Sequence, residues 1–170
     1  GLKGDLIQYG NVAFPLEKDN VIDIKVSEPF SDVDSVPWAN EAIEALRARG
    51  ILNGDGEGKF NPSRYVLREE FIKMLLLTMF ESVEEYDECV FEDVDKNAWY
   101  YPYVAYAVKN KIATGYSEKQ FGTGQYILRE EMAVFINRAL NSGGGKTEML
   151  KESFSVKDLN EISPYAVEGV

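Results

Sequence analysis

The chain contains Phe30-Ser31-Asp32-Val33-Asp34, which recurs as Phe91-Glu92-Asp93-Val94-Asp95, and Leu67-Arg68-Glu69-Glu70, which recurs as Leu128-Arg129-Glu130-Glu131. The two copies of each segment are separated by 61 positions. The same separation relates Trp38 to Trp99, Ile51 to Ile112, Gly54 to Gly115 and Phe60 to Phe121. A repeat of this length is a supersecondary unit too small to bury its own apolar face, so it stacks on its neighbours. The sequence therefore predicts an array of repeats, an architecture that usually binds or holds other molecules.

The composition argues against several classes of function. The 170 residues are 45% hydrophobic and 28% charged, which is ordinary for a globular protein. A net charge of −11 argues against binding to nucleic acid or to an anionic membrane, because both need a basic surface. No apolar run is long enough to cross a bilayer, so no membrane insertion is expected. The chain lacks histidine and has a single cysteine, so the commonest general base, the usual zinc ligands and an internal disulfide are missing. We therefore expect neither an enzyme nor a cofactor.

One loop resembles a calcium-binding sequence at first sight. Asp55-Gly56-Glu57-Gly58 is rich in carboxylates, but its copy, Tyr116-Ser117-Glu118-Lys119, has lost most of the oxygen ligands. No metal site is predicted.

Repeat one, residues 30–80, is expected to hold two helices. The first should begin near Pro37-Trp38, because proline suits the first turn, and should end at Gly50, because glycine suits the left-handed position after a helix. The second should begin at about Arg68. The apolar spacing predicts the buried faces as Ala39, Ile43 and Leu46, then Phe71, Ile72, Leu75, Leu76 and Met79.

Repeat two, residues 91–140, has the same layout. Its expected buried faces are Tyr100, Val104 and Ala107, then Met132, Phe135, Ile136 and Leu140. Linkers follow the repeats at 81–90 and 141–153. A third repeat starts at 154–170, where Ser163-Pro164-Tyr165-Ala166 matches Val36-Pro37-Trp38-Ala39. Residues 1–29 lie outside the repeat, and alternating apolar residues at 21–26 predict a short β segment, either an N-terminal extension or the tail of a preceding β domain.

The ordered elements of each repeat resemble the S-layer homology motif. The elements are F-x-D-V, a W-A pair about six residues on, G-I-x-x-G, F-x-P and a T-R-A-E-like tetrapeptide that opens a helix. The resemblance covers residues 30–170, with two full motifs and the start of a third. It implies a mainly α fold of tandem motifs that form a pseudo-three-fold spindle, here with an incomplete third motif.

The function that the resemblance implies is non-covalent anchoring of a surface protein to the cell wall of a Gram-positive-type bacterium. The implied partner is pyruvylated secondary cell-wall polysaccharide, which binds in grooves between motifs. Two alternatives stay open: the repeats pack against protein neighbours in a surface lattice without glycan binding, or they anchor an exported enzyme whose catalytic domain lies outside this chain. The chain departs from the family pattern at Leu67 and Leu128, where the family has Thr, and at Glu69 and Glu130, where it has a small residue.

Arg68 and Arg129 are the leading candidates for glycan binding. Each stands at the start of a predicted helix, where the helix dipole favours anions, and a guanidinium can bind a carboxylate through two N–H groups. The pyruvate ketal that the resemblance implies carries such a carboxylate. Alternatively, each arginine pairs with an acid of the chain, for example Asp32, Asp34, Asp93 or Asp95.

The other candidates for the glycan site are Trp38, Trp99, Asp32, Asp93, Gly54 and Gly115. Each indole could stack on a sugar or anchor a helix start in the core. The aspartates could accept from sugar hydroxyls or cap the first helix of their repeat. The two glycines belong to the G-I-x-x-G element. Five tyrosines of repeat two could also face a glycan, although packing inside the protein is expected for at least half of them: Tyr100, Tyr101, Tyr103, Tyr106 and Tyr116.

The tetrapeptides also bear on helix capping. Glu70 and Glu131 keep the acidic position of a capping box, but a leucine cannot accept the backbone N–H that the family's Thr accepts. We expect Leu67 and Leu128 to be buried instead, since both repeats have the same apolar residue at this position.

Overall fold

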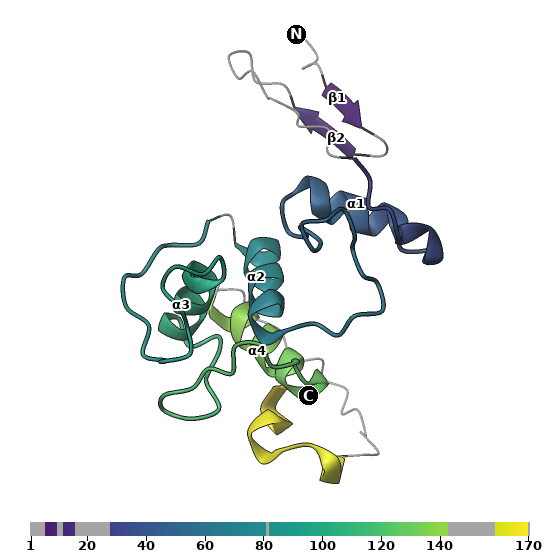
Figure 1. Ribbon diagram of the computed structural model, residues 1–170. Helices are drawn as coiled ribbons and strands as arrows, with labels where there is room; N and C mark the ends of the chain where they lie inside the picture. The colour runs from purple at the N-terminus through teal and green to yellow at the C-terminus, as the bar shows by residue number, and fades with distance from the viewer. Residues whose placement is uncertain (1–5, 10–11, 16–27, 81, 143–158, 170) are drawn as a thin grey trace, which may run out of the picture. The chain divides into compact units, whose positions relative to one another are not determined.

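The computed structural model describes residues 6–9, 12–15, 28–80, 82–142 and 159–169, and these are mainly helical, as predicted (Figure 1). The chain divides into two compact units, Gly1–Pro62 and Ser63–Val170. This division falls inside repeat one, so the boundaries of the compact units do not coincide with those of the sequence repeats.

The first unit begins with a β hairpin. β1 (Leu6–Tyr9) and β2 (Val12–Pro15) pair antiparallel, with Leu6 opposite Pro15 and Tyr9 opposite Val12. The sequence pattern does not predict strands at these positions. The strand predicted at 21–26 lies outside the described residues.

The first helix of repeat one starts later than predicted. A 3₁₀ helix at Val33–Ser35 precedes α1 (Asn40–Ala48), and residues 37–39 form a turn in which the Ala39 amide donates to the Val36 carbonyl oxygen at 2.9 Å. Pro37 therefore belongs to this turn and not to the helix. The predicted end is confirmed, because Gly50 has φ +71° and its amide donates to the Arg47 carbonyl oxygen. Ile43 of α1 joins Phe30 and Val33 in a small core.

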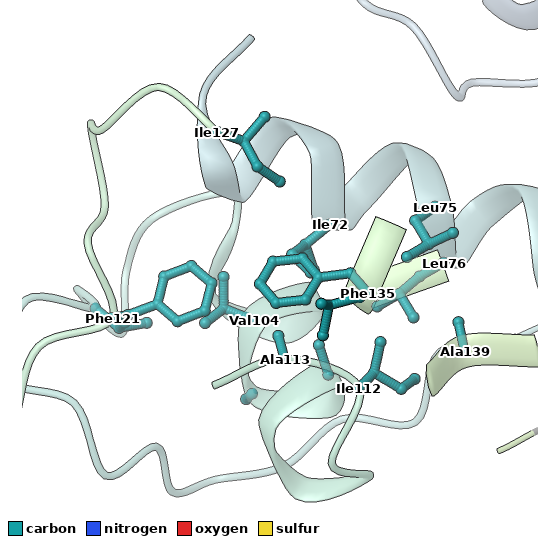
Figure 2. Packing of buried hydrophobic residues seen from close by; sticks show 14 of the residues in the cluster. Ile72, Leu75, Leu76, Val104, Ile112, Ala113, Phe121, Ile127, Phe135 and Ala139 are labelled. Atoms are coloured by element: carbon teal, nitrogen blue, oxygen red, sulfur yellow. The ribbon is translucent and has the colours of Figure 1, made fainter. Parts of the chain in front are cut away.

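The second unit is built on three helices, α2 (Arg68–Met79), α3 (Tyr101–Lys109) and α4 (Arg129–Ser142). Both helices of repeat two contact α2, the second helix of repeat one (Figure 1). Their shared core includes Ile72 and Leu76 of α2, Val104 of α3 and Phe135 of α4, with Phe121 contributed by a loop (Figure 2). Helix α2 thus buries its apolar face against the next repeat, as expected for stacked units.

The predicted buried face of α4 is partly wrong. Phe135 is buried and Met132 packs against the core, but Ile136 and Leu140 are exposed. The residues of α4 that are buried are Glu131, Val134, Phe135 and Ala139. Apolar side chains alone could not orient this helix, because its buried face includes a charged residue whose partner lies in repeat one.

The described start of the third repeat is short. It comprises two 3₁₀ helices, Leu159–Glu161 and Pro164–Gly169, where sequence analysis expected the first helix of a repeat. Pro164–Gly169 packs along α4, and Ala166 is fully buried in the core of the second unit (Figure 1). This segment therefore extends the stacking by one further step.

Candidate functional site

The side chain of Arg68 lies at the centre of a polar network between the repeats. It is the first residue of α2, and only 2% of its surface is exposed. Nη1 donates to Glu131 Oε1 at 2.5 Å, Nη2 to the carbonyl oxygen of Thr114 at 2.8 Å, and Nε to that of Phe121 at 3.2 Å. Arg68 therefore pairs with an acid of the chain, but the partner is Glu131 of repeat two and none of the four aspartates named above.

Aromatic rings enclose the guanidinium. Its Cζ lies 4.3 Å from the ring centroid of Tyr116, 5.0 Å from that of Phe121 and 5.2 Å from that of Phe135, within the range of cation–π interactions. Burial raises the pKa of Tyr116, so its hydroxyl stays protonated at neutral pH. The same hydroxyl lies 3.4 Å from Glu131 Oε2. The charge of Arg68 is thus balanced by one carboxylate and three ring faces.

A cavity of about 210 Å³ adjoins the Arg68–Glu131 pair. Its lining combines the start of α2, a loop of repeat two, α4 and the start of the third repeat: Arg68, Thr114, Gly115, Tyr116, Glu131, Val134, Phe135 and Tyr165. The cavity therefore lies between consecutive repeats. A guanidinium has five N–H donors, and the bonds that Arg68 makes to described residues use three of them. The other two N–H groups are one on each terminal nitrogen.

The paired aspartates have the same structural task in both repeats. Asp32 accepts from the amides of Phe60 and Asn61, each at 2.8 Å. Asp93 accepts from the amides of Phe121 and Gly122, each at 2.7 Å, and from that of Thr123 at 3.1 Å. The Phe60 amide is the main cause that lowers the pKa of Asp32, and the loop amides lower the pKa of Asp93 although burial alone would raise it. These carboxylates tie the F-x-D-V segment to a loop, and neither caps the first helix of its repeat.

Gly54 and Gly115 allow two segments of a repeat to approach closely. A Cβ on Gly54 would overlap the ring of Phe30 and the carbonyl oxygen of Lys59. A Cβ on Gly115 would overlap the ring of Phe91 and the carbonyl oxygen of Gln120. Both glycines are thus explained by packing, and Gly115 also lines the cavity.

Trp38 and Trp99 are not core anchors. Trp38 is 87% exposed and Trp99 is 54% exposed. The Trp99 ring packs edge-on against Tyr100, and Lys73 Nζ lies 5.8 Å from its centroid. Burial lowers the pKa of this lysine. Neither tryptophan lines the cavity, so both remain candidates for sugar contacts outside it.

Four of the five tyrosines of repeat two pack inside the protein, as expected for at least half of them. Tyr101 is buried, and Tyr100, Tyr103 and Tyr106 pack against the core as partly buried side chains. Tyr116 is exposed and lines the cavity.

Arg129 and Arg68 occupy the same repeat position in different environments. Arg129 is exposed, and the described part of the chain shows no partner for its side chain. Beside it, Leu128 is 54% exposed, whereas Leu67 is half-buried, so the predicted burial of these leucines is wrong for Leu128. The acidic half of each capping box is present, because the Leu67 amide donates to Glu70 at 2.9 Å and the Leu128 amide to Glu131 at 2.8 Å.

Glu69 and Glu130, the residues that depart from the family pattern, both bind a later segment of the chain. Both carboxylate oxygens of Glu69 accept from the Gly124 amide, at 3.0 and 3.1 Å. Glu130 accepts from the Ser163 amide at 2.9 Å, the Ser163 hydroxyl at 2.8 Å and the Tyr165 hydroxyl at 3.1 Å. Neither role could be deduced from one repeat alone.

Several residues of the cavity are not predicted as site residues by the sequence, chiefly Glu131, Tyr165 and Thr114. The sequence indicates Glu131 only as part of a capping box, whereas its bond to Arg68 joins equivalent helix starts of neighbouring repeats. Within the described segments, no group of three or more acidic or cysteine side chains is placed to hold a metal ion. The helices that the structure describes include none with the length and hydropathy of a membrane span.

The family model of the S-layer homology domain matches residues 29–72 and 90–133, half of the chain. The chain belongs to this family. It is 30% identical over 95% of its length to the exoglucanase XynX of Acetivibrio thermocellus, and 27% identical over 81% to the surface-layer 125 kDa protein of Lysinibacillus sphaericus. It is also 27% identical over 84% to an endoglucanase of Bacillus sp. (strain KSM-635). The chain spans only 12–15% of the length of these relatives.

Proposed function

We propose that the chain anchors a surface protein non-covalently to the bacterial cell wall, by binding pyruvylated secondary cell-wall polysaccharide between its repeats. The observation that carries the proposal is the cavity between the repeats, with the buried Arg68 in its wall. A carboxylate of the polymer would take the two N–H groups of Arg68 that remain, and the Tyr116 ring beside them would contact the sugar.

The relatives support an anchoring role separate from catalysis. Proteins named as a surface-layer protein and as two glucanases share this region, which is a small fraction of each. A region common to proteins of such different names is best explained as a module that locates its host. On this basis the chain is a binding module of the cell surface and supplies no catalytic step.

The acidic net charge restricts where an anionic polymer can bind. At a net charge of −11, the protein repels anions over a Debye length of about 10 Å at 0.1 M salt. Binding therefore needs local cations, and the exposed Arg129 at the start of α4 is proposed as a second contact for the polymer. Trp38 and Trp99 are proposed as additional stacking surfaces because they are exposed.

Co-sedimentation with purified sacculi tests the proposal. The chain is expected to sediment with intact sacculi, to lose binding when the secondary polymer is extracted, and to lose most of it when mild acid removes the pyruvyl ketals alone. Undiminished binding after extraction of the polymer would refute wall-polysaccharide anchoring. Binding that needs the polymer but not its pyruvyl groups would refute the role of the carboxylate.

A further inference from the structure

Among the residues of the third repeat that the structure describes, Tyr165 is the one in the wall of the cavity. It is 53% exposed, so packing in the core does not explain its position. Its hydroxyl donates to Glu130 Oε1 at 3.1 Å. One end of the side chain is therefore fixed while much of the ring remains accessible, an arrangement that suits contact with a ligand.

Glu130 binds the third repeat at three points. Besides the Tyr165 hydroxyl, it accepts from both the amide and the hydroxyl of Ser163, at 2.9 and 2.8 Å. The Ser163 amide is the main cause that lowers the pKa of Glu130, so this carboxylate is ionised at neutral pH. Burial and the neighbouring Glu130 raise the pKa of Tyr165 to about 12, which keeps its phenol a hydrogen-bond donor.

The equivalent residue of repeat one serves a different segment. In the described part of the chain, Glu69 accepts from the Gly124 amide, which belongs to a loop of repeat two, and makes no bond to an aromatic residue. Glu130 thus binds a residue of the cavity wall, Tyr165, whereas Glu69 at the same repeat position does not. The family pattern, with a small residue here, would have no side chain to make these bonds.

We propose that Glu130 is a positioning residue that holds Tyr165 at the edge of the Arg68 cavity, where the Tyr165 ring contacts a bound saccharide. The inference rests on the proposed function for the identity of the ligand. It adds that the start of the third repeat is part of the binding site, and that a residue outside the family pattern sets its position. Ser163 and Tyr165 would both lose their acceptor on replacement of Glu130 by alanine.

Two measurements on the 170-residue chain test the proposal: hydrogen–deuterium exchange of the peptide that contains Leu159–Gly169, and titration calorimetry with wall polysaccharide released from sacculi. Glu130→Ala is expected to speed exchange of this peptide at least tenfold and to weaken affinity at least tenfold. Glu130→Gln keeps an acceptor and should lie between the wild type and Glu130→Ala in both. Tyr165→Phe keeps the ring and should bind better than Tyr165→Ala. Tyr116→Ala serves as a matched control, because it removes an aromatic residue of the cavity that Glu130 does not hold, and should leave exchange of the Leu159–Gly169 peptide unchanged.

The outcomes separate this inference from the proposed function. Unchanged exchange in Glu130→Ala would show that Glu130 does not hold the segment, and would overturn the inference whether or not the polymer binds. Faster exchange with unchanged affinity, or equal affinity of Tyr165→Ala and the wild type, would show that the third repeat is outside the site. A wild-type chain that does not bind the polymer would refute the proposed function and the ligand contact of Tyr165 together, while the exchange result would still decide the role of Glu130.

Discussion

Replacement of Arg68 by alanine is predicted to destabilise the second unit far more than replacement of Arg129, although both arginines open a helix at the same repeat position. The side chains of Arg68 and Glu131 are 2% and 4% exposed. Removing one partner of such a pair leaves the other charge buried without a counterion, which costs about 3–5 kcal/mol. Arg129 is exposed, so its loss should change the free energy of unfolding by no more than about 0.5 kcal/mol.

Urea unfolding followed by tryptophan fluorescence measures both variants. Trp99 lies in the same unit as Arg68 and its ring packs against Tyr100, so it reports on that unit, whereas Trp38 is 87% exposed and contributes little change. In a double-mutant cycle, Arg68→Ala with Glu131→Ala should be less destabilised than the sum of the single variants by about 0.5–3 kcal/mol. If Arg68→Ala and Arg129→Ala unfold at the same urea concentration, the buried pair does not stabilise the unit and the reasoning is wrong.

The variants Arg68→Ala and Arg129→Ala also bear on the proposed contacts of these two arginines with the polymer. Loss of affinity in Arg68→Ala cannot be separated from loss of stability, but Arg129→Ala keeps the fold. A charge-assisted hydrogen bond contributes about 1.5–3 kcal/mol, so Arg129→Ala should bind the polymer roughly ten- to a hundredfold more weakly. Affinity equal to that of the wild type would remove Arg129 from the site.

Four further variants have effects that follow from the local environment of one residue. Leu128→Thr should raise the free energy of unfolding by about 1 kcal/mol, because this exposed N-cap position lacks an oxygen. Leu67→Thr should raise it by less, because Leu67 is half-buried. An equal change in urea midpoint for the two variants would contradict this. Burial raises the pKa of Glu69, so its ionised form destabilises the fold above that pKa, and Glu69→Gln should be more stable than the wild type at pH 7. The difference should shrink as the pH falls below the raised pKa and vanish below the ordinary pKa of 4.5, which thermal unfolding from pH 3 to 7 would show. Gly115→Ala should lose about 1–3 kcal/mol in urea unfolding through overlap with Phe91, since Gly115 has no left-handed φ to explain a loss otherwise.

Local signals predicted the elements of the fold, because they act within a few residues of one another. The start of α2 at Arg68 and the left-handed Gly50 after α1 are both set by helix-end chemistry that the sequence displays. The start of α1 was misplaced because proline also suits the turn that precedes Asn40. Asp32 and Asp93, which recur at the repeat spacing, make the same tether in both repeats, although the sequence predicted helix caps or sugar contacts for them.

Contacts between repeats could not be predicted in the same way. Arg68 and Glu131 are 63 residues apart, and no local pattern marks which of the 29 acidic residues a given arginine meets. That choice depends on how α2 and α4 stack, which in turn depends on which face of α4 is buried. The apolar spacing predicted that Ile136 and Leu140 of α4 face the core. Both are exposed, and the buried Glu131 shows that a different face of α4 is turned toward the core.

The two repeats are therefore equivalent in the contacts within each repeat, but they differ in the contacts that their second helices make with other parts of the chain. Inside each repeat, an aspartate ties the same loop, a glycine allows the same approach, and a pair of phenylalanine rings packs at 5.7 or 5.8 Å. At the helix starts this equivalence ends: Arg68 is buried and Arg129 is exposed, and Glu69 and Glu130 bind different segments. Selection for folding acts on every copy of a repeat alike, whereas a ligand meets each junction separately. If the chain binds a wall polymer as proposed, the positions where the copies differ in environment are where specificity for that polymer can be set without loss of the fold.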